Sequence, residues 1–519
     1  MEGNDPPENE GLRLPPECGL EPLSSNFELR ENSRVSEQLT FYDTWEWSLW
    51  FQRLFLFSGQ NKIHLAESEQ GWPGTALVIA DVQRSFPRFA REFVDPGLRR
   101  ELSTITGLRA LGRIASLRVV RRKFDLLNEQ EKVVCRLDLT EISPEKDEPF
   151  YRFVALQPLR GYHAEAKTAR DLLEAHGATP MVHGPLAALF EHEGRTPREY
   201  TLKPVFNIRH DTRAREALRK IVRRMLEIAV SNENGILQDI DTEFLHDYRI
   251  CIRKIRSVMS LVKGVFPQER TQSLKRKLST LTNATNRLRD LDVYLLARNE
   301  YTHLLPEALR TGLEAMFRDF AQERKRALKK MRVHLTSPAY RNQIEELDRF
   351  FTSPDALPAS PASELPIGPL IAHRICKRYR TIRRLQKTLT PETPDKVVHQ
   401  LRISCKKLRY LLEFFGELFP SAETAQIVKQ LRRLQNRLGL FNDYSVQQQA
   451  LLQYWNGQHS KNGRRERTDL LSLSLGGLIA VLHQKQQIQR KRIHNALDAF
   501  CSKEVKKLFQ QAFKVDSIP

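Results

Sequence analysis

An internal duplication constrains the fold of this 519-residue chain more than any other sequence feature. At an offset of 153 positions, residues 246–293 and 399–446 align without a gap and are identical at 13 of 48 positions. Each copy opens with the pattern H-x-x-R-x-x-x-[RK]-K-[IL]-R and carries a Phe-Pro pair further on. Identical anchors over such a length mark an internal repeat, so we expect two similar structural units in this part of the chain.

The opening segment of each copy is predicted to be an amphipathic helix. At about 100° per residue, its His and three basic residues fall within a stripe roughly 80° wide, opposite an apolar face with core spacing. The basic stripes are His246, Arg249, Arg253 and Arg256, and His399, Arg402, Lys406 and Arg409. The apolar faces are Tyr248, Ile252, Ile255, Met259 and Val262, and Leu401, Cys405, Leu408, Leu412 and Phe415. Asp241 or Thr242 can cap the first helix, and Thr393-Pro394 can start the second.

These stripes differ from an ordinary solvated face. Opposite charges interleave on a face that is only solvated, whereas these stripes are almost purely basic, carry a His at the same place and recur. The charge of the whole chain follows the same division. Residues 1–205 hold 26 Lys and Arg against 31 Asp and Glu, and residues 206–519 hold 57 against 32, for net charges of −5 and +25. The C-terminal part alone is therefore expected to bind a polyanion.

A second motif follows each helix after about forty residues. It reads Leu-Arg-Asp-Leu-Asp-Val at 288–293 and Asn-Asp-Tyr-Ser-Val at 442–446. Together with the helices, these motifs resemble the CHAD domain, a conserved-histidine α-helical domain built from two helical-bundle halves. The resemblance covers roughly residues 206–515 and implies an all-α duplicated bundle with a basic cleft that binds inorganic polyphosphate. The second copy has Asn442 in place of Arg289 and Ser445 in place of Asp292, which leaves open whether both halves contribute equally.

The predicted polyphosphate-binding residues combine the two stripes with neighbouring cations. They are His246, Arg249, Arg253, Lys254, Arg256, His399, Arg402, Lys406, Lys407 and Arg409, with Arg223, Arg224, Arg383 and Arg384 from the basic helices that precede each copy. A His in such a stripe can donate a hydrogen bond to a phosphate oxygen, and nearby phosphate charge favours its protonated form. Asp290 and Asp443 are expected to hold arginines of the neighbouring helix in place.

Neither metal binding nor catalysis is predicted for this part of the chain. Glu243 lies three residues before His246, but Lys396 takes that place in the second copy, and a ring of arginines repels cations. No nucleophile stands with a base and no Gly-rich phosphate loop occurs, so we expect no catalytic residue and no cofactor. Nonspecific nucleic-acid binding is the alternative function. It is disfavoured because the stripes contain almost no aromatic residues for base stacking and no recognition-helix arrangement stands out.

The N-terminal part has the texture of an α+β domain. Short β-branched and aromatic runs between turn residues predict a closed or strongly curved, barrel-like antiparallel sheet. The expected strands are 38–42, 53–57, 61–65, 76–80, 117–126, 132–140 and 150–156, with a hairpin turn at 58–61 and helices at 87–111 and 163–176.

The order of segments 41–45, 53–57, 117–122 and 136–138 resembles the CYTH family, triphosphate tunnel proteins often fused ahead of a CHAD domain. Active members open with E-x-E-x-K, whose glutamates bind divalent metal. The nearest segment here, 28–32, has Arg30 and Asn32 where the second Glu and the Lys belong. We therefore predict a degenerate, non-hydrolytic domain, in which Arg118, Arg121 and Arg122 are exposed strand residues. An active triphosphatase is the alternative.

These features predict a domain organisation. A disordered arm at 1–25 precedes the CYTH-like domain at 26–205, with a linker at 180–204, and the helical domain at 206–519 has halves at about 206–352 and 370–515 around a Pro-rich divide at 353–369. About ten helices are expected, at 210–230, 246 onward, 268–300, 306–334, 338–352, 370–389, 394–418, 421–456, 465–485 and 487–514. The six cysteines form no C-x-x-C pair, and neither a signal peptide nor a membrane span stands out. We expect a reduced cytoplasmic protein, with association with polyphosphate granules following from its ligand. The sequence does not indicate an oligomeric state.

Overall fold

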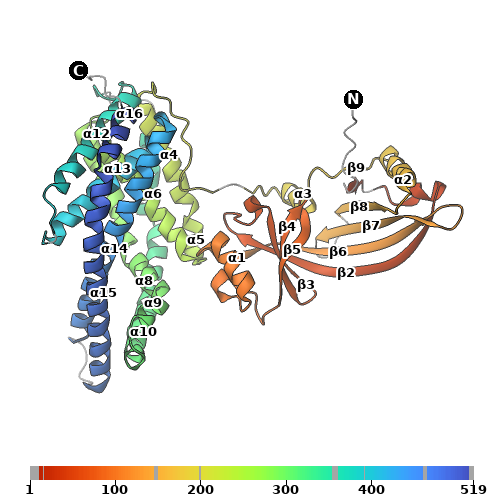
Figure 1. Cartoon of the computed structure of the whole chain (residues 1–519), viewed down its shortest axis with the longest axis horizontal. Coiled ribbons are helices and arrows are strands. Elements are labelled where there is room, and N and C mark those ends of the chain that lie inside the picture. Colours follow the sequence, from red (N-terminus) through yellow and green to blue (C-terminus); the bar gives the residue numbers. More distant parts are fainter. Residues whose placement is uncertain are drawn as a thin grey trace. The chain divides into compact units, whose positions relative to one another are not determined.

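The computed structural model describes residues 11–513 except 16, 145–149, 198–199, 353–359, 391 and 460–464. The chain divides into two compact units, Met1–Thr201 and Leu202–Pro519. Figure 1 shows both units and labels most of their helices and strands.

The first unit is built on one antiparallel sheet of nine strands in the order β5-β4-β3-β2-β6-β7-β8-β1-β9. The strands are β1 (Leu12–Leu14), β2 (Glu28–Thr44), β3 (Leu54–Gly59), β4 (Lys62–Glu69), β5 (Trp72–Asp81), β6 (Leu111–Leu127), β7 (Val133–Pro144), β8 (Tyr151–Pro158) and β9 (Thr179–Pro180). Among the described residues β5 and β9 are the two edges, so the sheet is not closed into a barrel as the sequence predicted. Closure needs paired edge strands, and the two-residue β9 offers few groups for such pairing.

Three helices complete the apolar cores of this unit. They are α1 (Pro96–Thr106), α2 (His163–Ala175) and α3 (Pro185–His192), with 3-10 turns η1 (Glu21–Ser25), η2 (Trp50–Gln52) and η3 (Ala90–Glu92). Leu98 and Leu102 of α1 pack in one cluster with Leu56 and Ile63 of β3 and β4. Other clusters contain Leu173 of α2 with β7 and β8, and Phe190 of α3 with Phe41 and Phe55. Helices thus cover separate parts of the sheet and leave polar strand positions between them exposed.

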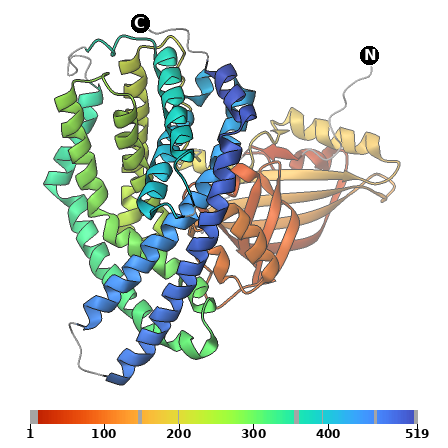
Figure 2. The ribbon, with the colours of Figure 1, turned by 60° about the vertical axis from the view of Figure 1, so that its left-hand side comes forward.

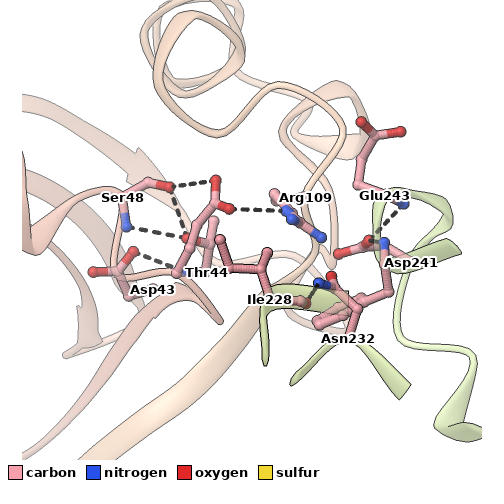
Figure 3. A network of polar contacts seen from close by, with 10 residues as sticks. Asp43, Thr44, Ser48, Arg109, Ile228, Asn232, Asp241 and Glu243 are labelled. Carbon is pink, nitrogen blue, oxygen red and sulfur yellow. Dashed lines mark hydrogen bonds and ion pairs between the residues drawn. The ribbon is translucent and has the colours of Figure 1, made fainter. Parts of the chain in front are cut away.

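A buried carboxylate shapes the turn that follows β2. Asp43 accepts hydrogen bonds from the backbone N–H groups of Thr44, Leu49 and Trp50 at 2.6, 3.0 and 2.9 Å. Burial raises the pKa of Asp43 to about 6, although these donors favour its charged form. Figure 3 shows Asp43, Thr44 and Ser48 of this turn. Glu46, in the same turn, forms an ion pair with Arg109 at 3.2 Å.

The structure confirms the seven predicted strands, although most are longer than expected. It also confirms the hairpin turn, because Gly59 pairs with Lys62 and the two loop residues, Gln60 and Asn61, both have positive φ. Three expectations are corrected. Residues 12–14 form β1 and pair with β8, whereas residues 1–10 of the predicted disordered arm lie outside the described residues. Within 87–111 only 96–106 is α-helical, and the predicted linker contains α3.

The second unit is all-α, as the sequence predicted. Its helices are α4 (Ala214–Ser231), α5 (Glu233–Gln238), α6 (Thr242–Leu261), α7 (Gln268–Ala284), α8 (Asn286–Leu296), α9 (Arg298–His303), α10 (Glu307–Thr336), α11 (Pro338–Thr352), α12 (Ile367–Gln386), α13 (Asp395–Phe415), α14 (Ser421–His459), α15 (Arg465–Phe500) and α16 (Lys503–Ala512), with a 3-10 turn η5 (Gly416–Leu418). Its described residues contain one isolated β-bridge, between Arg213 and Pro366. Figure 2 shows α14 and α15 lying side by side over most of their length.

The duplicated segments begin at equivalent positions. Helices α6 and α13 start at Thr242 and Asp395, and α7 and α14 start at Gln268 and Ser421, each pair 153 positions apart. The predicted helix at 268–300 is divided into α7, α8 and α9, whereas α14 continues without a break. The two predicted helices after residue 465 are instead α15 and the short α16.

Candidate functional site

The two repeated helices, α6 and α13, pack against one another inside the helical unit. Asp241 caps α6, since its carboxylate accepts hydrogen bonds from the backbone N–H groups of Glu243 and Phe244 at 2.8 and 3.3 Å (Figure 3). Thr393 does not cap α13, which starts one residue later than predicted, after Pro394. Every residue of the two predicted apolar faces is buried. The core therefore determines how the two helices are rotated about their axes.

That rotation brings six cations of the two stripes together. Arg253 of α6 lies close enough to Arg402 and Lys406 of α13 for its charge to lower the pKa of both. Arg249 lies beside Arg253, and Arg256 and Arg409 lie beside Lys406. The name basic cluster is used below for Arg249, Arg253, Arg256, Arg402, Lys406 and Arg409.

Matching arginines of the cluster have matching acidic neighbours. The charge of Asp290 acts on Arg249, and that of Asp443 acts on Arg402, at equivalent positions of the two copies. Arg249 also donates to the carbonyl oxygen of Thr282 at 3.2 Å and to Asn286 Oδ1 at 2.9 Å. Burial lowers the pKa of Arg249 to about 10. The two aspartates therefore lie near these arginines, and their expected role of holding the arginines in place stays a prediction.

The lysines at the next motif position have different surroundings. The Lys254 side chain is 8% exposed, donates to the carbonyl oxygen of Leu202 at 2.7 Å and lies 3.8 Å from Glu413 Oε2. Glu413 also forms an ion pair with Arg409 at 3.2 Å. Lys254 is therefore a buried ion-pair residue rather than an accessible cation. Its counterpart Lys407 is half-buried, near cations that we did not predict as site residues, namely Lys263, Lys275 and Arg378.

Lys406 has the most strongly perturbed charge of the cluster. It is half-buried on α13. Burial, followed by the charges of Arg253, Arg402, Arg409 and Arg256, lowers its pKa to about 7. Four guanidinium groups around one ammonium group make an arrangement that favours a bound anion.

The two motif histidines have different neighbours. His399 is exposed, and its Nδ1 lies 3.1 Å from Asn442 Oδ1. His246 is grouped with Glu243 and Asp247, with one ligand atom from each within 4.8 Å of the others. These three residues could hold a metal ion, but Arg289 already lies 3.6 Å from Glu243 Oε1. Positions 396 and 400 of the second copy hold Lys and Gln, so this group is not duplicated.

The four arginines predicted from preceding helices make other contacts. Arg223 and Arg224 are exposed on α4, and Arg224 forms an ion pair with Glu227 at 3.1 Å. Arg383 of α12 lies near Tyr379 and Cys501, and Arg384 is exposed. In the part of the chain that the structure describes, none of the contacts given for these four arginines is with a residue of the basic cluster.

Sequence reasoning missed Tyr410, a buried residue of α13 beside the basic cluster. Its ring centroid lies 5.7 Å from Lys406 Nζ and 5.7 Å from Arg409 Cζ. The first copy has Ser257 at this position, so the repeat gave no signal for an aromatic residue there.

The three arginines predicted to be exposed residues of one strand, Arg118, Arg121 and Arg122, lie on β6 of the first unit. Alternate residues of a strand face opposite sides of the sheet, so Arg118 and Arg122 of β6 lie on one face and Arg121 on the other. Arg122 forms an ion pair with Glu31 at 2.6 Å, and Arg121 forms one with Glu37 at 2.8 Å. Hydrogen bonds from Arg122 lower the pKa of Glu31. The CYTH-like identity of this unit stays a prediction.

The fold and the basic cluster define a duplicated, all-α domain with converging cations. Residues 220–452, which include both repeated helices, match the family model of the CHAD domain, so the chain contains a CHAD domain in this region. Among solved structures, the CHAD domain from the plant Ricinus communis is 23% identical with a TM-score of 0.47, covering 58% of this chain and 95% of that one. PptA from Streptomyces chartreusis is 16% identical with a TM-score of 0.43, covering 55% and 99%. No curated protein matches the chain.

None of the described helices has the length and apolar character needed to cross a membrane.

Proposed function

We propose that the helical unit binds inorganic polyphosphate across the basic cluster. The observation that carries this proposal is the convergence of six cations from two repeated helices, with Arg253 of α6 among the cations of α13. Among the residues that the structure describes, three carboxylates lie near these six cations, namely Asp290, Asp443 and Glu413. Positive charge therefore exceeds negative charge in the cluster. A polyanion would relieve the repulsion and accept charge-assisted hydrogen bonds.

A phosphate chain suits this cluster better than a nucleic acid. Tyr410, the aromatic residue described beside the cluster, is buried, so its ring is not available to stack on a base. A chain of phosphates carries closely spaced charge without bases, which matches guanidinium groups on facing helices. The CHAD domain match supports the same ligand, because domains of this family are associated with polyphosphate binding.

A binding titration of the full chain with long-chain polyphosphate, with duplex DNA as competitor, tests the proposal. Arg253→Ala combined with Arg402→Ala should weaken binding by tens-fold to hundreds-fold, since each charge-assisted contact contributes on the order of 1.5–3 kcal/mol before screening. The dependence of affinity on salt should also become less steep, because fewer counterions are released.

Arg209→Ala combined with Arg349→Ala is the matched control, because both side chains are largely exposed and the variant loses the same charge elsewhere. Its affinity should equal that of the parent protein. If the folded cluster variant binds polyphosphate as tightly as the parent protein, these arginines are only solvated surface residues. If the parent protein binds DNA more tightly than polyphosphate, the nucleic-acid alternative is favoured.

For the first unit we propose a non-hydrolytic role. Segment 28–32, the nearest to the metal-binding motif, holds two acidic residues. Glu31 is paired with Arg122, and Glu28 lies 3.7 Å from Arg30. Carboxylates held by arginines are poor ligands for a divalent cation. Phosphate release from tripolyphosphate, measured with magnesium and with manganese, should not exceed the background. Release that disappears in Glu31→Gln would establish a triphosphatase instead.

A further inference from the structure

The two copies of the motif differ at the centre of the basic cluster. Arg253 in the first copy corresponds to Lys406 in the second. Arginines keep their charge through neutral and mildly alkaline pH, whereas a lysine can lose its proton there when it is buried near other cations. Only the second copy therefore places a lysine at the centre of the cluster, where its charge can change near neutral pH.

The charged groups that face Lys406 come from three helices. Arg253 and Arg256 lie on α6, and Arg402, Arg409 and the Tyr410 ring lie on α13. Asp443 of α14 is near enough for the charge of Lys406 to lower its pKa. No described carboxylate forms an ion pair with Lys406, so the four guanidinium groups dominate its surroundings.

We propose that polyphosphate binding at the basic cluster is coupled to uptake of one proton by Lys406, so that affinity falls as the pH rises above neutrality. This inference rests on the proposed function. Phosphate oxygens among the guanidinium groups would offset the repulsion that disfavours the ammonium form, and they would accept its hydrogen bonds. The complex would then hold Lys406 protonated at a pH where the free protein holds it neutral.

The direction and size of the effect follow from linkage. The pKa of Lys406 in the free protein is about 7, and a bound polyanion raises it. Below pH 7 the lysine is already charged and affinity is insensitive to its titration. Above pH 7 each binding event takes up a proton, so affinity falls about twentyfold between pH 7.5 and 9.0.

Isothermal titration calorimetry of the full chain with long-chain polyphosphate tests the coupling. At pH 8, comparison of buffers with different ionisation enthalpies should give an uptake close to one proton for the parent protein. Lys406→Arg, which copies the first half of the repeat, should bind with little proton uptake and with affinities at pH 7.5 and 9.0 that agree within about threefold. Lys406→Gln, a neutral side chain, should bind at both pH values about as weakly as the parent does at pH 9.0.

The outcomes separate this inference from the function on which it rests. If the parent protein binds polyphosphate and Lys406→Arg shows the same proton uptake and pH dependence as the parent, the coupling is overturned and polyphosphate binding stands. No binding by the parent at pH 6.5 or 7.5 would overturn the proposed function itself. Long chains keep the contribution of titratable end phosphates small, and Lys406→Arg controls for what remains.

Discussion

Several residues at equivalent positions of the two repeats have different chemistry. Asp292, whose counterpart is Ser445, is buried and forms an ion pair with Arg324 at 2.6 Å, and Arg324 also reaches Asp239 at 2.6 Å. This network lies in the first half and explains why an aspartate is needed there. Lys406 in place of Arg253 is a difference of the same kind, but it affects the basic cluster rather than the core.

Replacing Lys406 should make the ligand-free protein more stable. Because the pKa of Lys406 in the folded protein is lowered to about 7, the unfolded chain binds more protons between pH 7 and its ordinary pKa near 10.4. Folding therefore costs most at pH 7 and below, and this cost disappears as the pH approaches the unfolded value. Lys406→Met should raise the free energy of unfolding by about 1–3 kcal/mol at pH 7, and by much less at pH 10.

Urea denaturation followed by circular dichroism at both pH values measures this difference. Lys263→Met serves as a control, since that lysine lies outside the basic cluster. A stabilisation by Lys406→Met that is equal at the two pH values would contradict the electrostatic explanation and indicate a gain in packing alone.

The break between α7 and α8 is the clearest difference between elements of the two halves. Thr285, at the break, is fully buried and donates to the carbonyl oxygen of Thr282 at 2.6 Å, and it also accepts a hydrogen bond from Arg249. Leu438 occupies the equivalent position in the continuous α14 and is buried as an apolar residue. One half thus uses a threonine to join a helix junction to the basic cluster, and the other half uses a leucine to continue a core stripe.

Thr285→Val should destabilise the helical unit by about 1–3 kcal/mol, because valine has a similar shape but leaves buried polar partners without the hydroxyl group. The matched control is Thr280→Val on α7, whose exposed hydroxyl group donates only to the carbonyl oxygen of Arg276, with an expected change within about 0.5 kcal/mol. Equal unfolding midpoints for the two variants in urea would show that the hydroxyl group of Thr285 is not needed at the junction.

The whole molecule consists of two units with separate apolar cores and opposite net charge. The helical unit begins at Leu202, whose carbonyl oxygen accepts the hydrogen bond of Lys254. A fragment of residues 202–519 should therefore fold alone as a helical domain with a cooperative urea transition. A fragment of residues 206–519 should be less stable, since the buried Lys254 loses an acceptor. Absence of a cooperative transition in the longer fragment would contradict the independence of this unit.

Local periodicity explains how much of this organisation was predictable. Alternation along the strands and the Gln60-Asn61 turn depend on neighbouring residues, and the sequence predicted them correctly. The open edge of the sheet was not predictable, because closure depends on pairing between strands far apart in the chain. The division of the predicted helix at 268–300 was missed because Thr285, at the break, is buried and contacts Arg249, 36 residues away, which residue spacing does not reveal.

The sequence by itself determined the repeat, the apolar faces of α6 and α13 and the sign of the charge on the opposite faces, because helical periodicity depends only on residue spacing. Only the tertiary structure decided which cations converge. It placed Arg253 among the cations of α13, buried Lys254 against Glu413 and gave Arg224 a partner on its own helix. The reason is that burial and charge–charge interactions depend on distances between helices. The packing of the core sets those distances, and they cannot be read from the spacing of residues along the chain.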